Sequence, residues 1–462
     1  MEYISFEHNN IAAELVKQAY DTPPLAFVHS YGCQQNVNDG ERIKGVLMDI
    51  GYGLCDKPED ADLILFNTCA VREHAEQRVF GNVGALKGLK EKKHDLIIGL
   101  CGCMANQKHV VEKLRQSYPY VDLVFGVDGI DTLPQLIAQK LQKHKRVLME
   151  PAQRPVIVEN IPIRRESEFR AWLPIMYGCD NFCTYCIVPY VRGRERSREP
   201  EKIIEECRGL IAEGYKEITL LGQNVNSYGK DLGTDYDFAD LLSAINAIPG
   251  DYWLRFMSSQ PKDATNKLFD TMARCEHVAK QLHLPVQSGC DRVLKAMNRP
   301  YTRAKYEEMI AYARSVMPSM VLTSDVIIGF PGETEDEAMQ TVDLVEKTQF
   351  DALFTFIFSP RPGTPAAKMD DPVSREEKQV WFEKLVDAQN AISAKKHAAY
   401  IGRTVKVLAD GESDDEAFPL AARTEGNRLV RMKGDKALIG TFAKAKITDS
   451  NTWALYGEAV EK

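Results

Sequence analysis

The chain has 462 residues, a length that favours two to four domains over a single one. Hydrophobic residues make up 44% of it and charged residues 27%, which is typical of a soluble globular protein. No apolar run approaches the roughly 18 residues of a membrane span, and the first residues resemble no secretory signal. We therefore expect a cytoplasmic protein with no membrane partner. The net charge of −8 means that any contact with nucleic acid must use local basic patches.

Residues 24–150 alternate between short apolar runs and longer segments that are rich in helix-forming residues. The apolar runs are 25–33, 63–69, 96–103 and 121–126. Strands separated by helices at this spacing predict a parallel sheet with crossover helices. We therefore expect an α/β domain over residues 24–150, preceded by an N-terminal extension over residues 1–23.

A proline-containing, charged stretch over residues 151–170 is typical of a linker. After it, six apolar segments with helical text between them predict a partial (β/α)6 barrel over residues 171–397. From residue 398 to 462 the segments are short and bounded by turns, which predicts a small antiparallel β-barrel. Barrels of this size often bind oligonucleotides. The predicted fold class of the whole chain is α/β.

The most specific motif, "YGCDNFCTYC", places Cys179, Cys183 and Cys186 at spacings of four and three residues. A structural zinc site or a closed iron–sulfur cluster takes four protein ligands. Three thiolates instead suggest a [4Fe–4S] cluster whose fourth iron is open to the amino and carboxylate groups of S-adenosylmethionine. The alternatives are thiols that merely pack and a zinc site completed by a distant ligand, although the next histidine, His277, lies outside zinc-finger spacing.

A second group of cysteines, Cys33, Cys69 and Cys103, ends three predicted strands about 35 residues apart. In a parallel sheet these strand ends lie at one edge, where ligands bind in open α/β folds. We expect a second [4Fe–4S] cluster there, with one iron free for an exogenous sulfur species. The alternative is chance placement, because cysteine is often simply buried.

The first motif, extended to "GCDNFCTYCIVPYVRGRERSR", resembles the signature of radical S-adenosylmethionine enzymes, and more narrowly that of the methylthiotransferases. The segments "YGCQQNVNDGE", "NTCAVREHAEQR" and "GCMAN" resemble the three N-terminal motifs of that family. The family pattern falls on Cys103 rather than on the nearby Cys101. The resemblance spans about residues 25–460. It implies two [4Fe–4S] clusters, with S-adenosylmethionine as both radical source and methyl donor.

The resemblance also implies residues that lie near S-adenosylmethionine. Tyr185 occupies the position of an aromatic residue near the adenine, although a buried structural tyrosine is the alternative. Other candidates lie in turns at predicted strand ends, where glycine and asparagine are common for structural reasons alone. These candidates are Gly222, Gln223, Asn224, Gln287 and Asp325.

Two basic segments, "YVRGRERSR" and "RTEGNRLVRMK", predict contacts with RNA. Arginine suits this role because its planar group both binds phosphate and stacks on bases, although a merely solvated charged face is equally consistent with the residues. The last segment of the chain resembles a TRAM domain, and "RTEGNR" resembles the form found in the branch that modifies isopentenylated adenosine. The candidate residues are Arg192, Arg194, Arg196, Arg198, Arg423, Asn427, Arg428 and Arg431.

Together, the resemblances imply methylthiolation of adenine C2 in N6-isopentenyladenosine beside the anticodon, within a tRNA anticodon stem-loop. The cluster in the first motif would yield a deoxyadenosyl radical, and the second cluster would deliver methylated sulfur. An electron donor resembling flavodoxin or ferredoxin, a sulfur donor and a monomeric enzyme are also expected. The alternative acceptors are threonylcarbamoyladenosine in tRNA and an aspartate of a ribosomal protein. A non-catalytic RNA-binding protein with structural zinc is an alternative of a different class.

Overall fold

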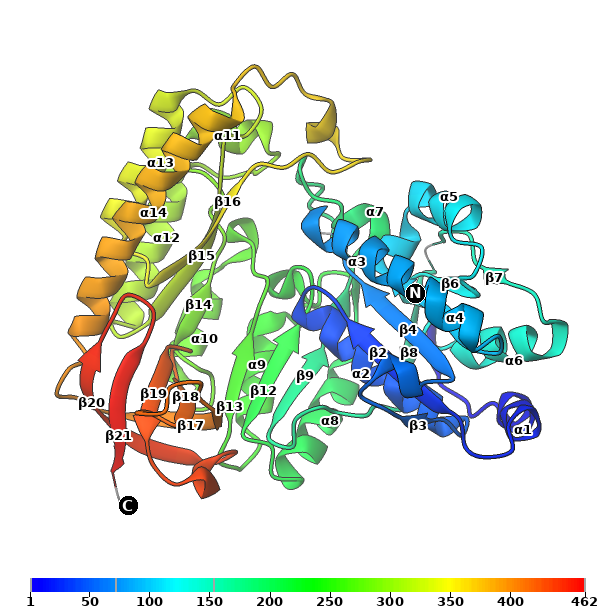
Figure 1. Cartoon of the computed structure of the whole chain (residues 1–462). Coiled ribbons are helices and arrows are strands. Elements are labelled where there is room, and N and C mark those ends of the chain that lie inside the picture. The colour runs from blue at the N-terminus through cyan, green and yellow to red at the C-terminus, as the bar shows by residue number, and fades with distance from the viewer. Residues whose placement is uncertain (1, 71–72, 153, 461–462) are drawn as a thin grey trace. The chain divides into compact units, whose positions relative to one another are not determined.

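The computed structural model of the chain describes residues 2–70, 73–152 and 154–460 (Figure 1). Its contacts divide the chain into two units, and the cysteine motif contributes residues to both. The first unit comprises Met1–Glu166, Met176–Phe182 and Cys186–Arg198, and the second comprises Ser167–Ile175, Cys183–Tyr185 and Glu199–Lys462. Within the described ranges, no helix is long and apolar enough to cross a membrane.

A six-stranded parallel sheet forms the centre of the first unit. In spatial order its strands are β3 (Gly53–Leu54), β2 (Leu25–Ser30), β4 (Leu63–Thr68), β5 (Ile97–Gly102), β6 (Leu123–Phe125) and β7 (Val147–Leu148). The intervening helices are α2 (Gln34–Asp49), η1 (Pro58–Asp60), α3 (Glu73–Ala85), α4 (Lys87–Lys92), η2 (Cys103–Asn106), α5 (Lys108–Ser117), η3 (Val127–Gly129) and α6 (Leu133–Lys143). This arrangement confirms the predicted parallel α/β fold.

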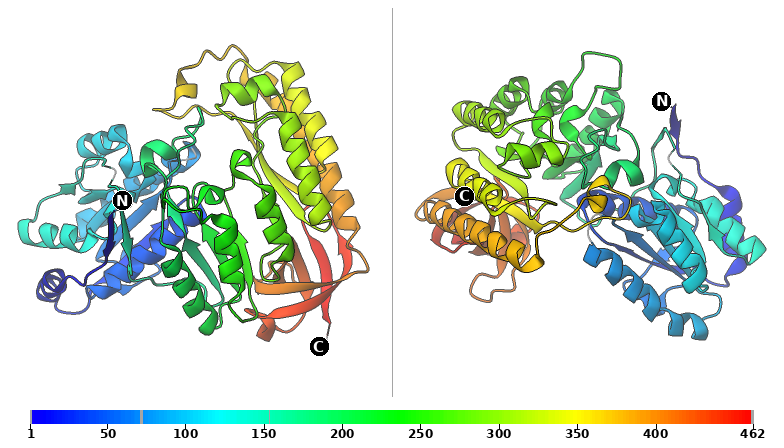
Figure 2. Two further views of the ribbon diagram at one scale, coloured as in Figure 1. Left: turned by 180° about the vertical axis from the view of Figure 1, so that it is seen from behind. Right: turned by 90° about the horizontal axis from the view of Figure 1, so that it is seen from above.

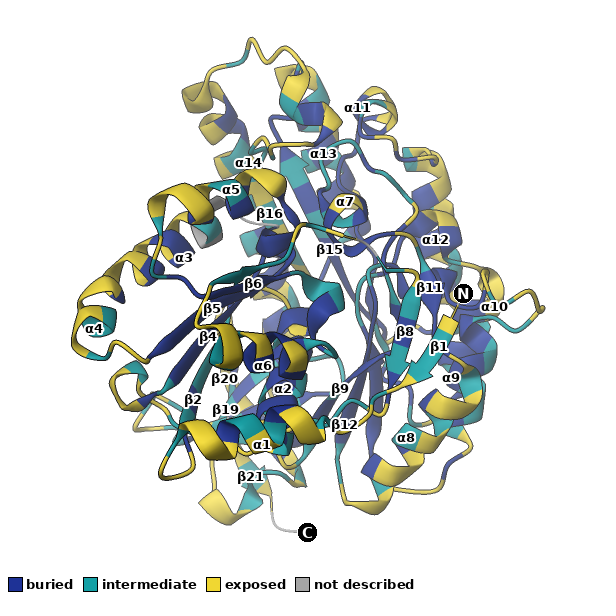
Figure 3. Cartoon of the chain, turned by 90° about the vertical axis from the view of Figure 1, so that its right-hand side faces the viewer, coloured by how far each residue is buried: buried dark blue, intermediate teal, exposed yellow. Residues whose placement is uncertain are grey.

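Both faces of this sheet are covered. Helices α2 and α6 bury apolar side chains against one face, and α3 and α5 do so against the other. Every residue of the central strands β4 and β5 is therefore buried, which explains why these strands read as unbroken apolar runs in the sequence. Figure 3 shows the strands in dark blue beneath helices whose outer faces are yellow.

The segments that flank the predicted α/β domain pair with each other. Strand β1 (Glu2–Ser5) lies parallel to β8 (Val156–Glu159), and α1 (Asn10–Ala19) packs into one core of the sheet. Residues 151–170, predicted as a linker, therefore contain a strand. Prolines and charged residues on both sides hide this four-residue strand from a reading of the sequence.

In the second unit, six parallel strands follow one another in chain order. They are β9 (Arg170–Pro174), β12 (Glu217–Leu221), β13 (Trp253–Phe256), β14 (Gln281–His283), β15 (Val321–Ile328) and β16 (Ala352–Ile357). An isolated bridge between Leu254 and Val278 joins the two halves of this arrangement. The six strands confirm the predicted partial barrel.

Helices cover the outside of this barrel. Both views of Figure 2 show this for the long helices that come before β15, between β15 and β16, and after β16 in the sequence. The helices are α8 (Pro200–Ala212), η4 (Val225–Ser227), α9 (Phe238–Asn246), η5 (Pro261–Asp263), α10 (Asn266–Arg274), α11 (Asp291–Ala296), α12 (Arg303–Val316), α13 (Glu335–Thr348), η6 (Pro365–Lys368) and α14 (Arg375–Ala398). Between β9 and α8, in the first unit, lie β10 (Met176–Tyr177), α7 (Val188–Arg192) and β11 (Arg196–Ser197).

The C-terminal strands close into a five-stranded barrel around an apolar core of their own. In spatial order they are β17 (Thr404–Glu412), β18 (Leu420–Thr424), β19 (Leu429–Lys433), β21 (Leu455–Val460) and β20 (Phe442–Ser450), with η7 (Lys436–Leu438) between β19 and β20 in the sequence. All neighbours are antiparallel except β19 and β21, which are parallel. A small β-barrel is confirmed, with one parallel pair that was not predicted.

The turn between β18 and β19 contacts the larger barrel through Arg255 of β13. The guanidinium of Arg255 donates hydrogen bonds to the carbonyl oxygens of Thr424 and Glu425. It also pairs with Glu217 of β12 at 2.6 Å. This buried cation therefore joins two strands of one barrel to a turn of the other.

The same turn also contacts the starting ends of β15 and β16. Arg428 forms a buried ion pair with Asp351, the residue before β16. Gly426 packs against Val321, the first residue of β15, so closely that a Cβ at this glycine would overlap the valine side chain. Charge pairing and close packing thus hold the turn against the amino ends of the barrel strands.

We predict that Arg428→Met weakens this junction by about 2 kcal/mol, because it removes a buried charged partner of Asp351. The urea concentration at which limited proteolysis releases the C-terminal barrel measures the effect. The matched control is Arg431→Met on the same barrel, whose half-buried side chain lies 4.0 Å from Asp415. That substitution should cost about 0.5 kcal/mol or less. Equal losses in the two variants would contradict the prediction.

Candidate functional site

The three N-terminal cysteines lie at the carboxyl ends of three neighbouring strands. Cys33 follows β2 and immediately precedes α2, Cys69 follows β4 directly, and Cys103 begins η2 after β5. Strand β4 pairs in parallel with β2 on one side and with β5 on the other. The structure therefore brings these three chain segments to one sheet edge, as the strand–helix spacing predicts.

Two residues bring the three thiols into one group. The Oδ1 atom of Asn36, in the first turn of α2, lies 3.9 Å from Cys33 Sγ and 3.8 Å from Cys103 Sγ. Gly32 has a φ of +110° and lies so close to Cys69 that an added Cβ would be 2.8 Å from its Sγ. Only glycine combines this backbone conformation with this close approach.

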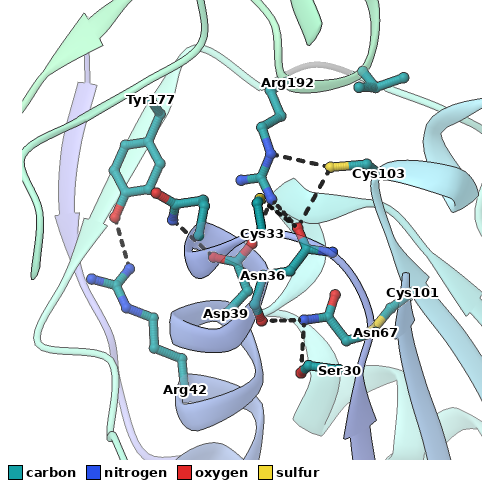
Figure 4. Close-up of polar contacts among 12 residues, drawn as sticks. Ser30, Cys33, Asn36, Asp39, Arg42, Asn67, Cys101, Cys103, Tyr177 and Arg192 are labelled. Carbon is teal, nitrogen blue, oxygen red and sulfur yellow. Dashed lines mark hydrogen bonds and ion pairs between the residues drawn. The ribbon is translucent and has the colours of Figure 1, made fainter. Parts of the chain in front are cut away.

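A buried guanidinium lies beside these thiols (Figure 4). Arg192, the last residue of α7, is 5% exposed. Its Nε donates to Cys103 Sγ at 3.1 Å, and its Nη2 donates to Asn36 Oδ1 at 2.7 Å and to Asp39 Oδ2 at 2.8 Å. Figure 4 shows Arg192 extending between the cysteine on one side and the two α2 side chains on the other.

The protonation of these cysteines depends on the same contacts. A hydrogen bond from Cys69, assisted by the charge of Arg192, lowers the pKa of Cys33 to about 6. Burial raises the pKa of Cys103, although Arg192 opposes the increase. Burial raises the pKa of Cys101 well above its ordinary value, and this thiol packs into an apolar core of the sheet. Because the thiolate is the form that binds metal, these environments favour Cys103 over Cys101 as a ligand.

The other cysteine motif lies on the loop between β10 and α7. Strands β10 and β11 form a short antiparallel ribbon that closes the base of this loop. Gly178 has a φ of +76°, and a Cβ there would overlap the carbonyl oxygen of Arg194. The backbone N–H of Cys179 donates to the oxygen of Gly193 at 3.1 Å, and Asn181 Nδ2 donates to the sulfur of Cys179 at 3.3 Å. The first cysteine of the motif is therefore held in a defined place.

Cys183, in the second unit, has polar neighbours of its own. Arg299 Nη1 donates to its sulfur at 3.5 Å, and Gln260 Nε2 lies 4.0 Å from the same sulfur. Arg299 is 7% exposed and is anchored by a 2.7 Å hydrogen bond to the carbonyl oxygen of Pro285. Only two residues, Thr184 and Tyr185, lie between Cys183 and the half-buried Cys186.

Tyr185 lies half-buried against an apolar cluster of the second unit. The buried members of the cluster are Cys290, Val293, Met297, Phe330 and Ala366. The preceding residue, Thr184, donates from its backbone to the oxygen of Met297 at 3.1 Å, which anchors this part of the motif to the residue that follows α11. An aromatic ring against an apolar wall suits contact with a flat ligand ring, and the adenine contact stays a prediction.

The predicted cofactor turn follows β12 directly. Gly222 and Asn224 are buried in it and Gln223 is half-buried. Asn224 Nδ2 donates to Asp263 Oδ2 at 2.7 Å, which connects the ends of β12 and β13. The turn therefore lies at the carboxyl ends of the barrel strands, where barrels of this kind place their active sites.

Two more predicted residues lie on the following strands. Gln287, after β14, has a φ of +71°, a conformation that costs a non-glycine residue about 1–3 kcal/mol and is concentrated at functional sites. Asp325 of β15 lies 3.6 Å from the imidazole Nε2 of His283 on β14. His283, which no sequence motif marks, therefore belongs with the candidate residues of the barrel interior.

Three further residues of this site are identified only from the structure: Ser259, Gln260 and Arg299. The Ser259 Oγ and Gln260 Oε1 atoms are buried and have no hydrogen-bond partner among the described residues. They follow β13, and Gln260 also reaches Cys183. Unpaired buried polar atoms cost free energy, so this pair fits a polar ligand at the strand ends. The polar "SSQP" after an apolar strand is the signal that sequence could offer.

Three of the four arginines in "YVRGRERSR" are buried within the first unit. Arg192 contacts Cys103 as described, Arg196 pairs with Asp128 at 3.4 Å, and Arg198 pairs with Glu159 at 2.6 Å. The structure does not support their predicted RNA role, because buried, paired guanidinium groups are not exposed to a phosphate. The sequence shows where the charges are but not that the chain folds them inward.

The structure does not support the predicted RNA role of Arg428 either, since its side chain is buried against Asp351 in the second unit. In contrast, 67% of the Arg194 side chain is exposed, and its guanidinium lies 5.1 Å from the ring centroid of Phe182. The residues for which RNA contact stays a prediction are Arg194, Arg423, Asn427 and Arg431.

The two sets of cysteines fit iron–sulfur clusters in residue type and surroundings. Each set contains a thiol that accepts a hydrogen bond from a buried arginine. Within the described ranges, no three His, Cys, Asp or Glu side chains are arranged to hold one metal ion together. A four-iron cluster does not need that arrangement, because each cysteine binds a different iron.

Three segments of the chain match known families. Residues 26–126 match Uncharacterized protein family UPF0004, residues 173–345 match the Radical SAM superfamily, and residues 398–460 match the TRAM domain. Solved structures share the fold. TsrM, a radical S-adenosylmethionine methyltransferase from Kitasatospora setae, covers 75% of this chain and 77% of its own, with a TM-score of 0.55 and 15% identity. At that identity the likeness shows the fold alone.

Several relatives are similar over nearly their whole length, and each is named tRNA-2-methylthio-N(6)-dimethylallyladenosine synthase. The protein of Thermoanaerobacter sp. (strain X514) is 48% identical, with 94% of this chain and 92% of the relative covered. Those of Clostridium botulinum (strain Langeland) and Desulforamulus reducens are each 47% identical, with 94% and 96% of this chain and 96% and 97% of the relatives covered. The chain therefore belongs to the tRNA-2-methylthio-N(6)-dimethylallyladenosine synthase family of radical S-adenosylmethionine enzymes.

Proposed function

We propose that the protein methylthiolates adenine C2 of N6-dimethylallyladenosine, the isopentenylated nucleoside beside the anticodon of tRNA. The observation that carries this proposal is the presence of two three-cysteine groups. One lies at the edge of the parallel sheet, and the other lies on the loop that follows β10. The names of the relatives favour this acceptor over threonylcarbamoyladenosine or a ribosomal-protein aspartate.

Each group of cysteines would hold one [4Fe–4S] cluster. Cys179, Cys183 and Cys186 would bind the cluster that the radical S-adenosylmethionine superfamily shares, and S-adenosylmethionine would complete it. The second cluster would bind to the other group, Cys33, Cys69 and Cys103. When bound, the two clusters and S-adenosylmethionine would supply radical, sulfur and methyl-transfer chemistry that amino-acid side chains cannot provide.

The chain's own residues bind and orient the reactants. No side-chain base removes a proton from adenine C2, because an aromatic C–H bond is too weakly acidic for that task. The polar atoms of Ser259 and Gln260 would hold polar parts of S-adenosylmethionine, and the ring of Tyr185 would pack against its adenine. Gln287 and Asp325 would line the approach to the reacting base from the barrel interior.

Recognition of the tRNA would use the exposed Arg194 and three half-buried polar or basic residues of the C-terminal barrel, because an unpaired loop is read by stacking and by phosphate contacts. The residues are Arg194, Arg423, Asn427 and Arg431. A one-electron donor that resembles flavodoxin or ferredoxin and a separate source of sulfur would complete the reaction. Both partners follow from its chemistry, since the electron and the sulfur atom must enter from outside the chain.

A reconstituted reaction tests the proposed function. With isopentenylated tRNA, S-adenosylmethionine, sulfide and a low-potential reductant, the protein should form the 2-methylthio nucleoside, which mass spectrometry of digested tRNA detects. Cys179→Ala should abolish both this product and the cleavage of S-adenosylmethionine to deoxyadenosine, because it removes a ligand of the radical-forming cluster. Cleavage that persists in this variant would remove that cluster from the mechanism.

Loss of the second cysteine group should separate the two activities. Cys69→Ala and Cys103→Ala should keep cleavage of S-adenosylmethionine but lower the yield of methylthiolated product by about 100-fold, since only sulfur delivery is affected. The matched control is Cys101→Ala on β5, two residues from Cys103, which should keep both activities. Methylthiolated tRNA from Cys69→Ala, or its loss in Cys101→Ala, would contradict the assigned ligands.

Metal analysis separates the enzyme from a zinc-containing RNA-binding protein. The anaerobically reconstituted protein should contain about eight irons, four for each cluster, and no stoichiometric zinc. The variant with Cys179, Cys183 and Cys186 all changed to alanine should contain about four irons, because the second group of cysteines is intact. Stoichiometric zinc without the brown absorbance of iron–sulfur clusters would refute the proposal.

A further inference from the structure

We infer that Arg192 is a positioning residue for the second cluster. Its guanidinium orients Cys103 and raises the one-electron reduction potential of the cluster at this site. The inference rests on the proposed function, because it assumes a cluster on Cys33, Cys69 and Cys103. It replaces the RNA contact that the sequence suggests for this arginine. Its basis is the contact network within the first unit shown in Figure 4.

The donor atoms of Arg192 are directed at partners on two different elements. Its Nε donates to Cys103 Sγ at 3.1 Å, beside the end of β5. Its Nη2 is shared by Asn36 Oδ1 and Asp39 Oδ2 at 2.7 and 2.8 Å, both on α2. One planar group therefore fixes a thiol relative to the helix whose first turn follows Cys33.

The partners of Arg192 are themselves held in place. Asn36 Nδ2 donates to the oxygen of Tyr31 at 2.9 Å, and Gln35 Nε2 donates to Asp39 Oδ1 at 3.1 Å. Helix α7, which carries Arg192, is tied to η2 by the hydrogen bond from Asn106 Nδ2 to the oxygen of Val191 at 2.7 Å. The chain's own contacts thus hold the guanidinium from both ends.

The sign of the effect follows from charge. One electron from a reductant makes a four-iron cluster more negative by one unit, and a buried cation that donates to a ligand sulfur stabilises this form. If Arg192 is replaced by a neutral residue, the site loses a positive charge while the negative charge of Asp39 remains. Both effects disfavour reduction. Arginine suits this position better than lysine because its planar fork can reach the sulfur and both α2 acceptors together.

The experiment uses a background in which Cys179, Cys183 and Cys186 are changed to alanine, so that only the second cluster contributes to the spectra. Arg192→Gln and Arg192→Lys are compared in it by iron content and by redox titration followed by electron paramagnetic resonance. The matched control is Arg198→Gln, whose arginine is equally buried in the same unit and is held by Glu159.

Arg192→Gln should lower the ratio of reduced to oxidised cluster about tenfold at a fixed potential, a shift of about 59 mV to more negative values. Arg192→Lys should give a smaller shift, because it keeps the charge but not the fork. Arg198→Gln should leave the potential unchanged. If Arg192→Gln takes up no iron while Arg198→Gln does, the result supports the positioning role, because cluster binding then requires Arg192 specifically.

The inference is refuted if Arg192→Gln keeps the potential of the background protein, or if Arg198→Gln shifts it equally. Loss of iron from both variants would indicate a general folding defect and would also contradict a specific role for Arg192. If the background protein with Arg192 intact takes up no cluster, the proposed second cluster itself is refuted. That outcome is distinguishable because it appears before any arginine is changed.

Discussion

Parallel pairing of β2, β4 and β5 is the constraint on which the N-terminal site depends. Parallel strands all end at the same edge, so cysteines separated by whole strand–helix units meet without any long loop. Glycines make the abrupt exits possible. Gly102 ends β5 with a φ of +91°, and a Cβ there would lie 2.5 Å from Asn67 Oδ1. An antiparallel β4 would place Cys69 at the opposite edge of the sheet, away from Cys33 and Cys103.

Both cysteine groups combine a thiol with a buried arginine. Arg192 donates to Cys103 in the first unit, and Arg299 donates to Cys183 in the second. A buried cation is costly unless anionic or hydrogen-bonding partners surround it. At Arg192 these partners are Asp39, Asn36 and the cysteine sulfur, so the arginine and the thiolate stabilise each other. The same physical solution therefore recurs on two unrelated elements of the fold.

Spacing and apolar runs were enough to predict the strands and the meeting of Cys33, Cys69 and Cys103 at one sheet edge, because parallel topology brings regularly spaced strand ends together. They were not enough for the arginines. Arg196 and Arg198 point inward because β11 pairs with β10 and the chain folds their guanidinium groups onto Asp128 and Glu159. These partners are distant in the sequence, so charge counting cannot find them. Ser259 is missed for a similar reason, since its unpaired oxygen is visible only once burial is known.

The docking of the turn between β18 and β19 limits how the C-terminal barrel can be removed or exchanged. Its recognition surface on the larger barrel includes Arg255, Val321 and Asp351, and the ring of Trp253 lies 4.6 Å from that of Phe442 on β20. A truncation at the end of α14 would uncover an apolar and charged patch. A chimera with a foreign barrel would need matching partners for it. The C-terminal barrel is therefore a structural part of the second unit and not an independent domain on a linker.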